Sequence, residues 1–198
     1  MKLILWAALT CGLICSCASS TKVPPPEILS RATWQAQPPI VEMKTHVPSR
    51  ITIHHTAVKQ NPQRTLAQKL TSLQKFSQNP GTLGSGKAKP AWPDVPYHYY
   101  IDCHGNVGEG RAVGFVGDTN TKYDPTGHAL VVLEGDFEQE EPTAAQLAAL
   151  RKMIAWLADR YQVPPERIGG HQDFAGTLCP GKNLQALLPE LRTAAESP

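Results

Sequence analysis

A histidine and a cysteine lie eight residues apart in a segment rich in glycine and proline, GGHQDFAGTLCPG. These residues, His171 and Cys179, can meet at one ion, and His54 in the segment RITIHHT would add a third ligand. Zinc binds imidazole and thiolate, and three protein ligands leave its fourth position open. An open zinc ion is typical of a catalytic centre, because it polarises a carbonyl group and lowers the pKa of bound water towards about 7. The alternative interpretation is a hydrogen-bonded core histidine and a small buried cysteine.

A second segment, GTLGSGK over residues 81–87, matches the start of a phosphate-binding P-loop. Ala88 stands where such a loop carries its magnesium-binding hydroxyl, and the segment follows a predicted helix instead of a strand. Pro90 and Pro93 prevent a helix after it. We therefore predict a flexible loop over residues 79–93 that binds no phosphate.

Hydrophobic periodicity predicts the elements that must position these side chains. They are strands over residues 50–56, 97–102 and 128–135, and helices over roughly 63–78, 143–161 and 184–191. The second helix is the clearest, because Thr143 and Gln146 form a capping box and two prolines follow its last turn. Strands and helices alternate without repeats, which predicts a single α/β domain over residues 28–198, with a central mixed β-sheet flanked by helices.

Composition excludes several classes of protein. The 198 residues are 41% hydrophobic, which suits one domain with a core. The net charge is +2, from 19 basic and 17 acidic side chains, without a long run of either sign. Nucleic-acid binding through phosphate contacts is therefore not expected.

The N-terminal residues resemble an export signal. Residues 1–16 carry a lysine and a short apolar run, and Ile14-Cys15-Ser16-Cys17 resembles a bacterial lipobox. We predict a signal peptide over residues 1–16, lipidation of Cys17, and a proline-rich tether over 17–27. Ala18 after the lipidated cysteine resembles the pattern of lipoproteins sent to the outer membrane, where the protein would face the periplasm. Cleavage of an ordinary signal near Ala18 is the alternative, and would give a soluble periplasmic or secreted protein.

Seven segments, in order along the chain, carry a resemblance to a known family. They are Ile28–Ala36 (ILSRATWQA), Ile53–Thr56 (IHHT), Trp92–Tyr97 (WPDVPY), Gly105–Arg111 (GNVGEGR), Gly135–Phe137 (GDF), Pro142–Thr143 with the capped helix, and Gly170–Gly181 (GHQDFAGTLCPG). The chain resembles the zinc-dependent N-acetylmuramoyl-L-alanine amidases, and within them the peptidoglycan recognition protein branch. The resemblance implies the fold of that family, Zn²⁺ as cofactor and peptidoglycan as substrate.

The resemblance also implies roles for individual residues. His54, His171 and Cys179 match the zinc ligands, while His55 points to the other face of its strand. Tyr97 matches the active-site tyrosine of the family, whose hydroxyl stabilises the tetrahedral oxyanion. Thr177 stands where catalytically competent members carry threonine or lysine, and its hydroxyl can donate to the same oxyanion. A half-buried strand tyrosine and a threonine bonded to its own loop are the alternatives for these two residues.

Two positions depart from the family pattern. Ala112-Val113 replaces a Gly-Trp pair that reads the third residue of the stem peptide, so a preference for diaminopimelate or lysine cannot be carried over. Val132 stands where other amidases place a general-base glutamate. Glu134 lies two residues on, on the same strand face, and would take that place if the register slipped by two. We interpret it as a solvated charge at the sheet edge and leave it out of the catalytic set.

Together these observations predict an exported, lipid-anchored and monomeric amidase that cleaves the bond between N-acetylmuramic acid and L-alanine in peptidoglycan. Two alternatives remain open. A disulfide between Cys103 and Cys179 would remove a zinc ligand and leave a receptor that binds peptidoglycan without cutting it, although we expect Cys103 to be a buried free thiol. A cytosolic recycling amidase is the other, and the signal segment argues against it.

Overall fold

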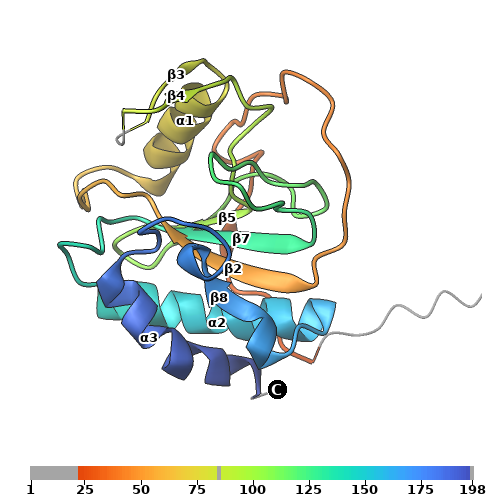
Figure 1. Ribbon diagram of the computed structural model, residues 1–198, viewed down its shortest axis with the longest axis vertical. Coiled ribbons are helices and arrows are strands. Elements are labelled where there is room, and N and C mark those ends of the chain that lie inside the picture. Colours follow the sequence, from red (N-terminus) through yellow and green to blue (C-terminus); the bar gives the residue numbers. More distant parts are fainter. Residues whose placement is uncertain (1–21, 84–85, 197–198) are drawn as a thin grey trace, which may run out of the picture.

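The computed structural model describes residues 22–83 and 86–196, which form a layered α/β domain (Figure 1). The strands are β1 (Ile28–Leu29), β2 (Arg50–His55), β3 (Gly81–Thr82), β4 (Ala88–Lys89), β5 (Tyr99–Ile101), β6 (Val107–Glu109), β7 (His128–Leu133) and β8 (Ile168–Gly170). The α-helices are α1 (Leu66–Ser77), α2 (Ala144–Tyr161) and α3 (Lys182–Arg192), and short 3-10 turns cover Pro165–Arg167, His171–Asp173 and Thr193–Ala195. The predicted signal peptide and Cys17 lie outside the described residues and stay predictions.

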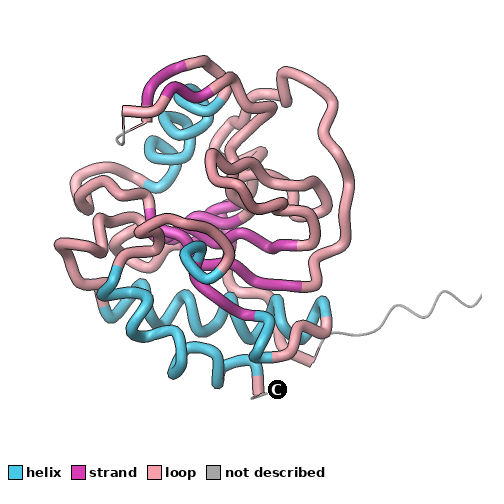
Figure 2. Tube along the Cα trace, viewed as in Figure 1, coloured by secondary structure: helices cyan, strands magenta, loops and turns pink. Residues whose placement is uncertain are grey.

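Six strands form the central sheet, in the order β1-β6-β5-β7-β2-β8. β5 and β6 are antiparallel, and the other neighbouring pairs are parallel. The sheet is therefore mixed, and the predicted fold class is confirmed. α2 and α3 cover one face of the sheet, while α1 and the small β3–β4 ribbon lie on the other (Figures 1 and 2).

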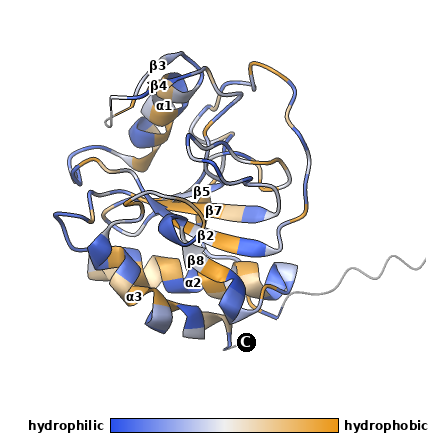
Figure 3. Ribbon diagram, in the orientation of Figure 1, coloured by the Kyte–Doolittle hydropathy of each residue, from blue (hydrophilic) through white to orange (hydrophobic). Residues whose placement is uncertain are grey.

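The two faces of β2 lie in different surroundings, because successive strand residues point to opposite sides of a sheet. Ile51 and Ile53 are fully buried in the core that α2 and α3 cover. His54 pairs in register with Val132 of β7, which belongs to the second core beneath α1. The alternation thus places His54 on the face that carries the candidate site. Hydrophobic residues occupy most of β2 and β7, whereas hydrophobic and hydrophilic residues mix along α2 and α3 (Figure 3).

α2 forms as its sequence pattern predicts. The Thr143 side chain accepts a hydrogen bond from the backbone N–H of Gln146, and the Gln146 side chain accepts one from the N–H of Thr143, which completes the capping box. The residues of its buried face recur at helical spacing: Ala149, Leu150, Met153, Ile154, Leu157 and Ala158. The helix ends at Tyr161, before Val163-Pro164-Pro165.

Replacing Thr143 by alanine should destabilise the domain by about 1–2 kcal/mol, because the cap is lost together with a hydrogen bond from its hydroxyl to the carbonyl of Cys103. Urea unfolding followed by circular dichroism measures this change. Thr71→Ala, on the exposed surface of α1, is the matched control and should change the free energy of unfolding by less than about 0.5 kcal/mol. Equal effects of both substitutions would contradict the capping role.

The segment predicted as a flexible loop over residues 79–93 is partly ordered into the antiparallel β3–β4 ribbon, so that prediction was wrong. The reason is the buried side chain of Lys89. Its ammonium group donates to the carbonyls of Ser77 and Pro90 and lies over the rings of Phe76 and Trp92, at 4.9 and 4.7 Å from their centroids. A cation is favourable at the C-terminal end of a helix, so Lys89 holds the ribbon against the end of α1.

The boundaries of other predicted elements also differ, most of all those of two strands. β5 begins at Tyr99, so Tyr97 and His98 precede the strand, and β7 ends at Leu133.

Of the predicted tether, residues 22–27 are described, and there the N–H of Val23 donates to Asp159 of α2. This part of the tether thus contacts the domain.

Within residues 22–83 and 86–196, no helix combines the length and apolar character that crossing a bilayer requires.

Candidate metal centre

The ends of two neighbouring parallel strands bring the two candidate histidine ligands together. β2 and β8 pair in a register that sets Ile53 beside Gly170. His54 follows Ile53 near the end of β2, and His171 follows Gly170 directly after β8. The two imidazole rings consequently lie 4.6 Å apart, centroid to centroid. Because this pairing joins residues more than a hundred positions apart, it is a product of the sheet and not of local sequence.

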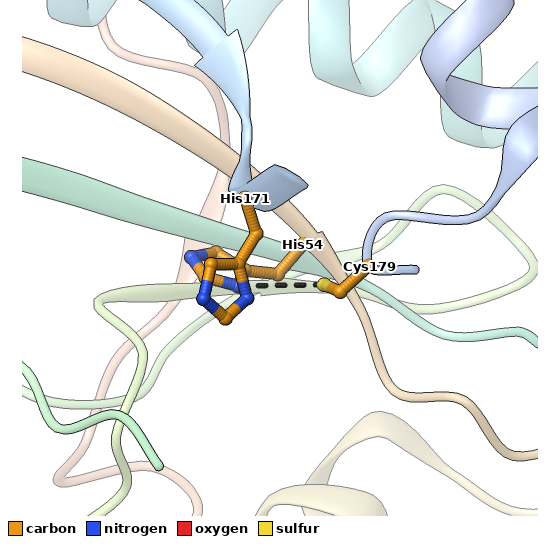
Figure 4. Close-up of side chains that lie close together, drawn as sticks. All are labelled: His54, His171 and Cys179. Carbon is orange, nitrogen blue, oxygen red and sulfur yellow. Dashed lines mark hydrogen bonds between the residues drawn. The ribbon is translucent and has the colours of Figure 1, made fainter. Parts of the chain in front are cut away.

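Cys179 reaches the same place from a loop that folds back on itself. The backbone N–H of Gln172 donates to the carbonyl of Cys179 at 2.7 Å, which closes the loop. The Cys179 Sγ atom lies 3.6 Å from Nδ1 of His54 and accepts the N–H of His55 at 3.4 Å. One candidate ligand atom from each of His54, His171 and Cys179 lies within 4.8 Å of the others (Figure 4). The structure therefore brings together all three predicted metal ligands.

Burial determines the protonation states of the three side chains. It lowers the pKa of His54 well below the usual value of a histidine, with a further contribution from His171. Burial likewise lowers the pKa of His171, to about 4, and raises the pKa of Cys179 to about 12. Both imidazoles are thus neutral near pH 7 and keep a lone pair. A bound metal cation would compensate the charge of a Cys179 thiolate, so the donor set fits zinc.

The surroundings of His54 argue against a purely structural histidine. Its Nε2 atom is buried and has no hydrogen-bond partner among the described residues. Its Nδ1 atom instead faces Cys179. A core histidine is normally held by hydrogen bonds to its ring nitrogens, as His98 is by Phe115 and Leu130. His54 is therefore oriented by the candidate site itself.

The structure places both candidate catalytic residues beside this cluster. The ring of Tyr97 lies 5.1 Å from that of His54, centroid to centroid, and burial raises the pKa of its hydroxyl, which stays protonated. Thr177 accepts the N–H of Cys179 at 3.2 Å through its hydroxyl oxygen. That contact is the local loop bond foreseen as the alternative for Thr177, but it leaves the hydroxyl proton free to donate.

The remaining histidines serve the scaffold. His55 accepts the N–H of Phe137 and lies on the opposite side of β2, as expected. His128 is buried and bonded to the hydroxyl of Thr52 at 2.7 Å. His46 links the carbonyl of Val113 to the N–H of Gly127.

Glu134 is not the solvated charge that the sequence indicated. Its carboxylate is buried and forms an ion pair with Lys69 of α1 at 2.7 Å. It also accepts the N–H groups of Asn61 and Cys103. Burial alone would raise the pKa of Glu134, but these hydrogen bonds hold it below its usual value. A carboxylate satisfied in this way is a poor general base, which agrees with leaving it out of the catalytic set.

Cys103 lies near this pair and is a buried free thiol, as predicted. Cys179 is also free, so the disulfide that would have removed a metal ligand is not formed.

A groove of about 500 Å³ opens next to Tyr97, between α1, the β3–β4 ribbon and the ends of the sheet strands. Its lining includes Thr56, Val58, Arg64, Lys69, Ser72, Leu73, Phe76, Thr82, Leu83, Trp92, Tyr97 and Glu134. The lining thus combines polar, aliphatic and aromatic side chains. An extended molecule bound there would lie beside the candidate metal centre.

Two residues near the site escaped the sequence analysis. Thr121 forms a hydrogen bond with Nε2 of His171 at 2.8 Å. The ring of Tyr123 lies 5.0 Å from that of His171, and its buried hydroxyl has no partner among the described residues. Both belong to an irregular segment before β7, where neither periodicity nor a motif marks a position as functional.

Comparisons with known proteins agree with this arrangement. The family profile described as N-acetylmuramoyl-L-alanine amidase matches residues 44–182, which span the three candidate ligands and Tyr97. An N-acetylmuramoyl-L-alanine amidase of Sus scrofa is 31% identical over 146 residues, which are 71% of this chain and 22% of that protein.

Solved structures match over most of the domain. The crystal structure of the Drosophila peptidoglycan recognition protein SD has a TM-score of 0.70 and 28% identity, and covers 85% of this chain and 95% of its own. Peptidoglycan recognition protein LE, in complex with tracheal cytotoxin, a monomeric diaminopimelic acid-type peptidoglycan, has a TM-score of 0.68 and 26% identity over 82% of this chain and 92% of its own. The chain belongs to the N-acetylmuramoyl-L-alanine amidase family, in its peptidoglycan-recognition-protein-like branch.

Proposed function

We propose that this protein is a zinc-dependent hydrolase that cleaves the amide bond between N-acetylmuramic acid and L-alanine in peptidoglycan. The observation that carries the proposal is the convergence of His54, His171 and Cys179 within 4.8 Å, beside Tyr97. A binding protein has no need of two neutral imidazoles and a thiol at one point. The amidase family and the groove next to Tyr97 support peptidoglycan as the substrate.

In this proposal His54, His171 and Cys179 hold the zinc ion. When bound, zinc supplies Lewis-acid polarisation of the scissile carbonyl and activates water. The Tyr97 hydroxyl is protonated at all physiological pH values, so it acts as a hydrogen-bond donor to the oxyanion that develops on that carbonyl. The Thr177 hydroxyl donates to the same oxygen, while its own oxygen stays bonded to the N–H of Cys179.

The groove would hold the stem peptide and the adjoining sugar. Peptidoglycan recognition protein LE binds a monomeric peptidoglycan fragment, and its fold matches most of this chain. We extend that substrate class to this protein. A signal peptide and a lipid anchor at Cys17 remain part of the proposal, and an anchor would keep the enzyme beside its polymeric substrate.

The test is to incubate the purified protein with intact peptidoglycan, with and without a zinc chelator, and to identify the products by mass spectrometry. Release of stem peptides that begin with L-alanine, lost on chelation and restored by zinc, is expected. Binding to the polymer without any peptide release, at full zinc occupancy, would contradict the enzyme and leave a receptor.

Replacing Tyr97 by phenylalanine should lower the rate of peptide release by roughly a hundredfold, because one oxyanion donor is removed. Zinc stoichiometry and the free energy of unfolding should stay unchanged, since the aromatic ring is retained. Initial rates on a soluble muropeptide measure the effect. An unchanged rate would show that the Tyr97 hydroxyl only fills space beside His54.

A further inference from the structure

Thr121 makes the hydrogen bond that occupies the second nitrogen of the His171 ring. Its Oγ1 atom lies 2.8 Å from Nε2 of His171. Only one nitrogen of an imidazole can bind a given metal ion, so this contact leaves Nδ1 of His171 as the ligand atom. A ligand histidine commonly uses its other N–H to bond a fixed acceptor, which sets the orientation of the ring.

A second threonine offers an acceptor for the hydroxyl proton of Thr121. Thr119 accepts the backbone N–H of Thr121 at 3.1 Å, and the two hydroxyl oxygens lie 2.8 Å apart. The Thr119 oxygen has a second acceptor site, so it can also accept the hydroxyl proton of Thr121. With that proton directed at Thr119, the oxygen of Thr121 can only accept from the ring, which places the hydrogen of His171 on Nε2.

The alternative proton arrangement is incompatible with a metal. If Thr121 donated its proton to Nε2, the neutral ring of His171 would carry its hydrogen on Nδ1, and that nitrogen would have no lone pair for an ion. The loop before β7 therefore affects the metal affinity of the site, although it supplies no ligand.

Resting on the proposed zinc site, we propose that Thr121 is a positioning residue of the metal centre. Its hydroxyl accepts the Nε2–H of His171, selects the tautomer with a free Nδ1 lone pair, and fixes the plane of the ring. Nothing in the sequence pattern indicates this role, because Thr121 lies in an irregular segment fifty residues before its partner.

The test compares zinc affinities of the full-length wild type and three variants, measured by competition with a chromophoric chelator. Thr121→Val should weaken zinc binding by about 10- to 100-fold, the usual effect of removing such a partner. Thr121→Ser keeps the hydroxyl and should bind within about threefold of wild type. Thr126→Val, in the same loop but bonded to Lys44, is the matched control and should be unchanged.

A second readout needs no metal. Nitrogen-15 NMR of the histidine rings in the metal-free protein should show His171 as the Nε2–H tautomer in wild type, and a shift towards Nδ1–H in Thr121→Val. Wild-type affinity and an unchanged tautomer in Thr121→Val would overturn the inference and leave the zinc site standing. If the wild type itself fails to bind zinc, that result contradicts the proposed function as well as the role of Thr121. Failure of the inference alone and failure of the proposed function are therefore distinguishable.

Discussion

Replacing Cys179 by serine should abolish both zinc binding and peptide release. A hydroxyl is a far weaker zinc ligand than a thiolate, and the remaining His54 and His171 give only two protein donors. We expect the rate to fall at least about a thousandfold, which corresponds to about 4 kcal/mol in the activation barrier. Zinc content by plasma emission spectroscopy and product release by mass spectrometry measure the two effects.

Cys103→Ser is the matched control, because Cys103 is the other free cysteine of the described residues and lies away from the cluster. It should retain full zinc content and a rate close to that of wild type. The Cys179→Ser variant should still bind peptidoglycan, since the groove next to Tyr97 does not include Cys179 in its lining. Full activity of Cys179→Ser would refute the proposed metal centre, whereas loss of activity in both variants would show a general requirement for thiols.

Replacing Lys69 by methionine should destabilise the domain by about 3–5 kcal/mol, because it leaves the buried carboxylate of Glu134 without its ion-pair partner. The double variant Lys69→Met with Glu134→Leu should recover most of that loss, since no uncompensated charge remains. Chemical denaturation measures all of these free energies. Arg151→Met breaks the exposed pair with Glu190 and should cost less than about 1 kcal/mol.

The effect of Lys69→Met should depend on pH in a defined direction. The pKa of Glu134 is lowered in the folded wild type, so its contribution to stability is present above the pKa of the unfolded state and is lost as the pH falls through the lowered value. Without Lys69, burial should raise the pKa of Glu134 instead. The difference between wild type and variant should be largest near neutral pH and narrow in acid. A difference that does not change with pH would assign the loss to packing.

Much of this protein can be predicted locally. In β2, apolar residues alternate with residues of the face that carries the site. α2 has its N-terminal cap and its buried apolar residues within one segment. The loop from His171 to Cys179 is indicated by the glycines in and around it and by Pro180. Those signals depend on neighbours within a few positions, where hydrophobic period and capping chemistry act. The candidate ligands and Tyr97 could therefore be named from residue types, and the resemblance to the family supplied their roles.

What escaped prediction depends on contacts between distant segments. Lys89 orders a glycine-rich stretch by reaching the end of α1, Lys69 crosses from a helix to the buried Glu134, and Thr121 holds His171 from an irregular loop. Each residue taken alone looks like a solvated side chain, because lysine, glutamate and threonine are mostly exposed in proteins. Burial with a partner reverses that expectation, and burial is a property of how the sheet and helices come together.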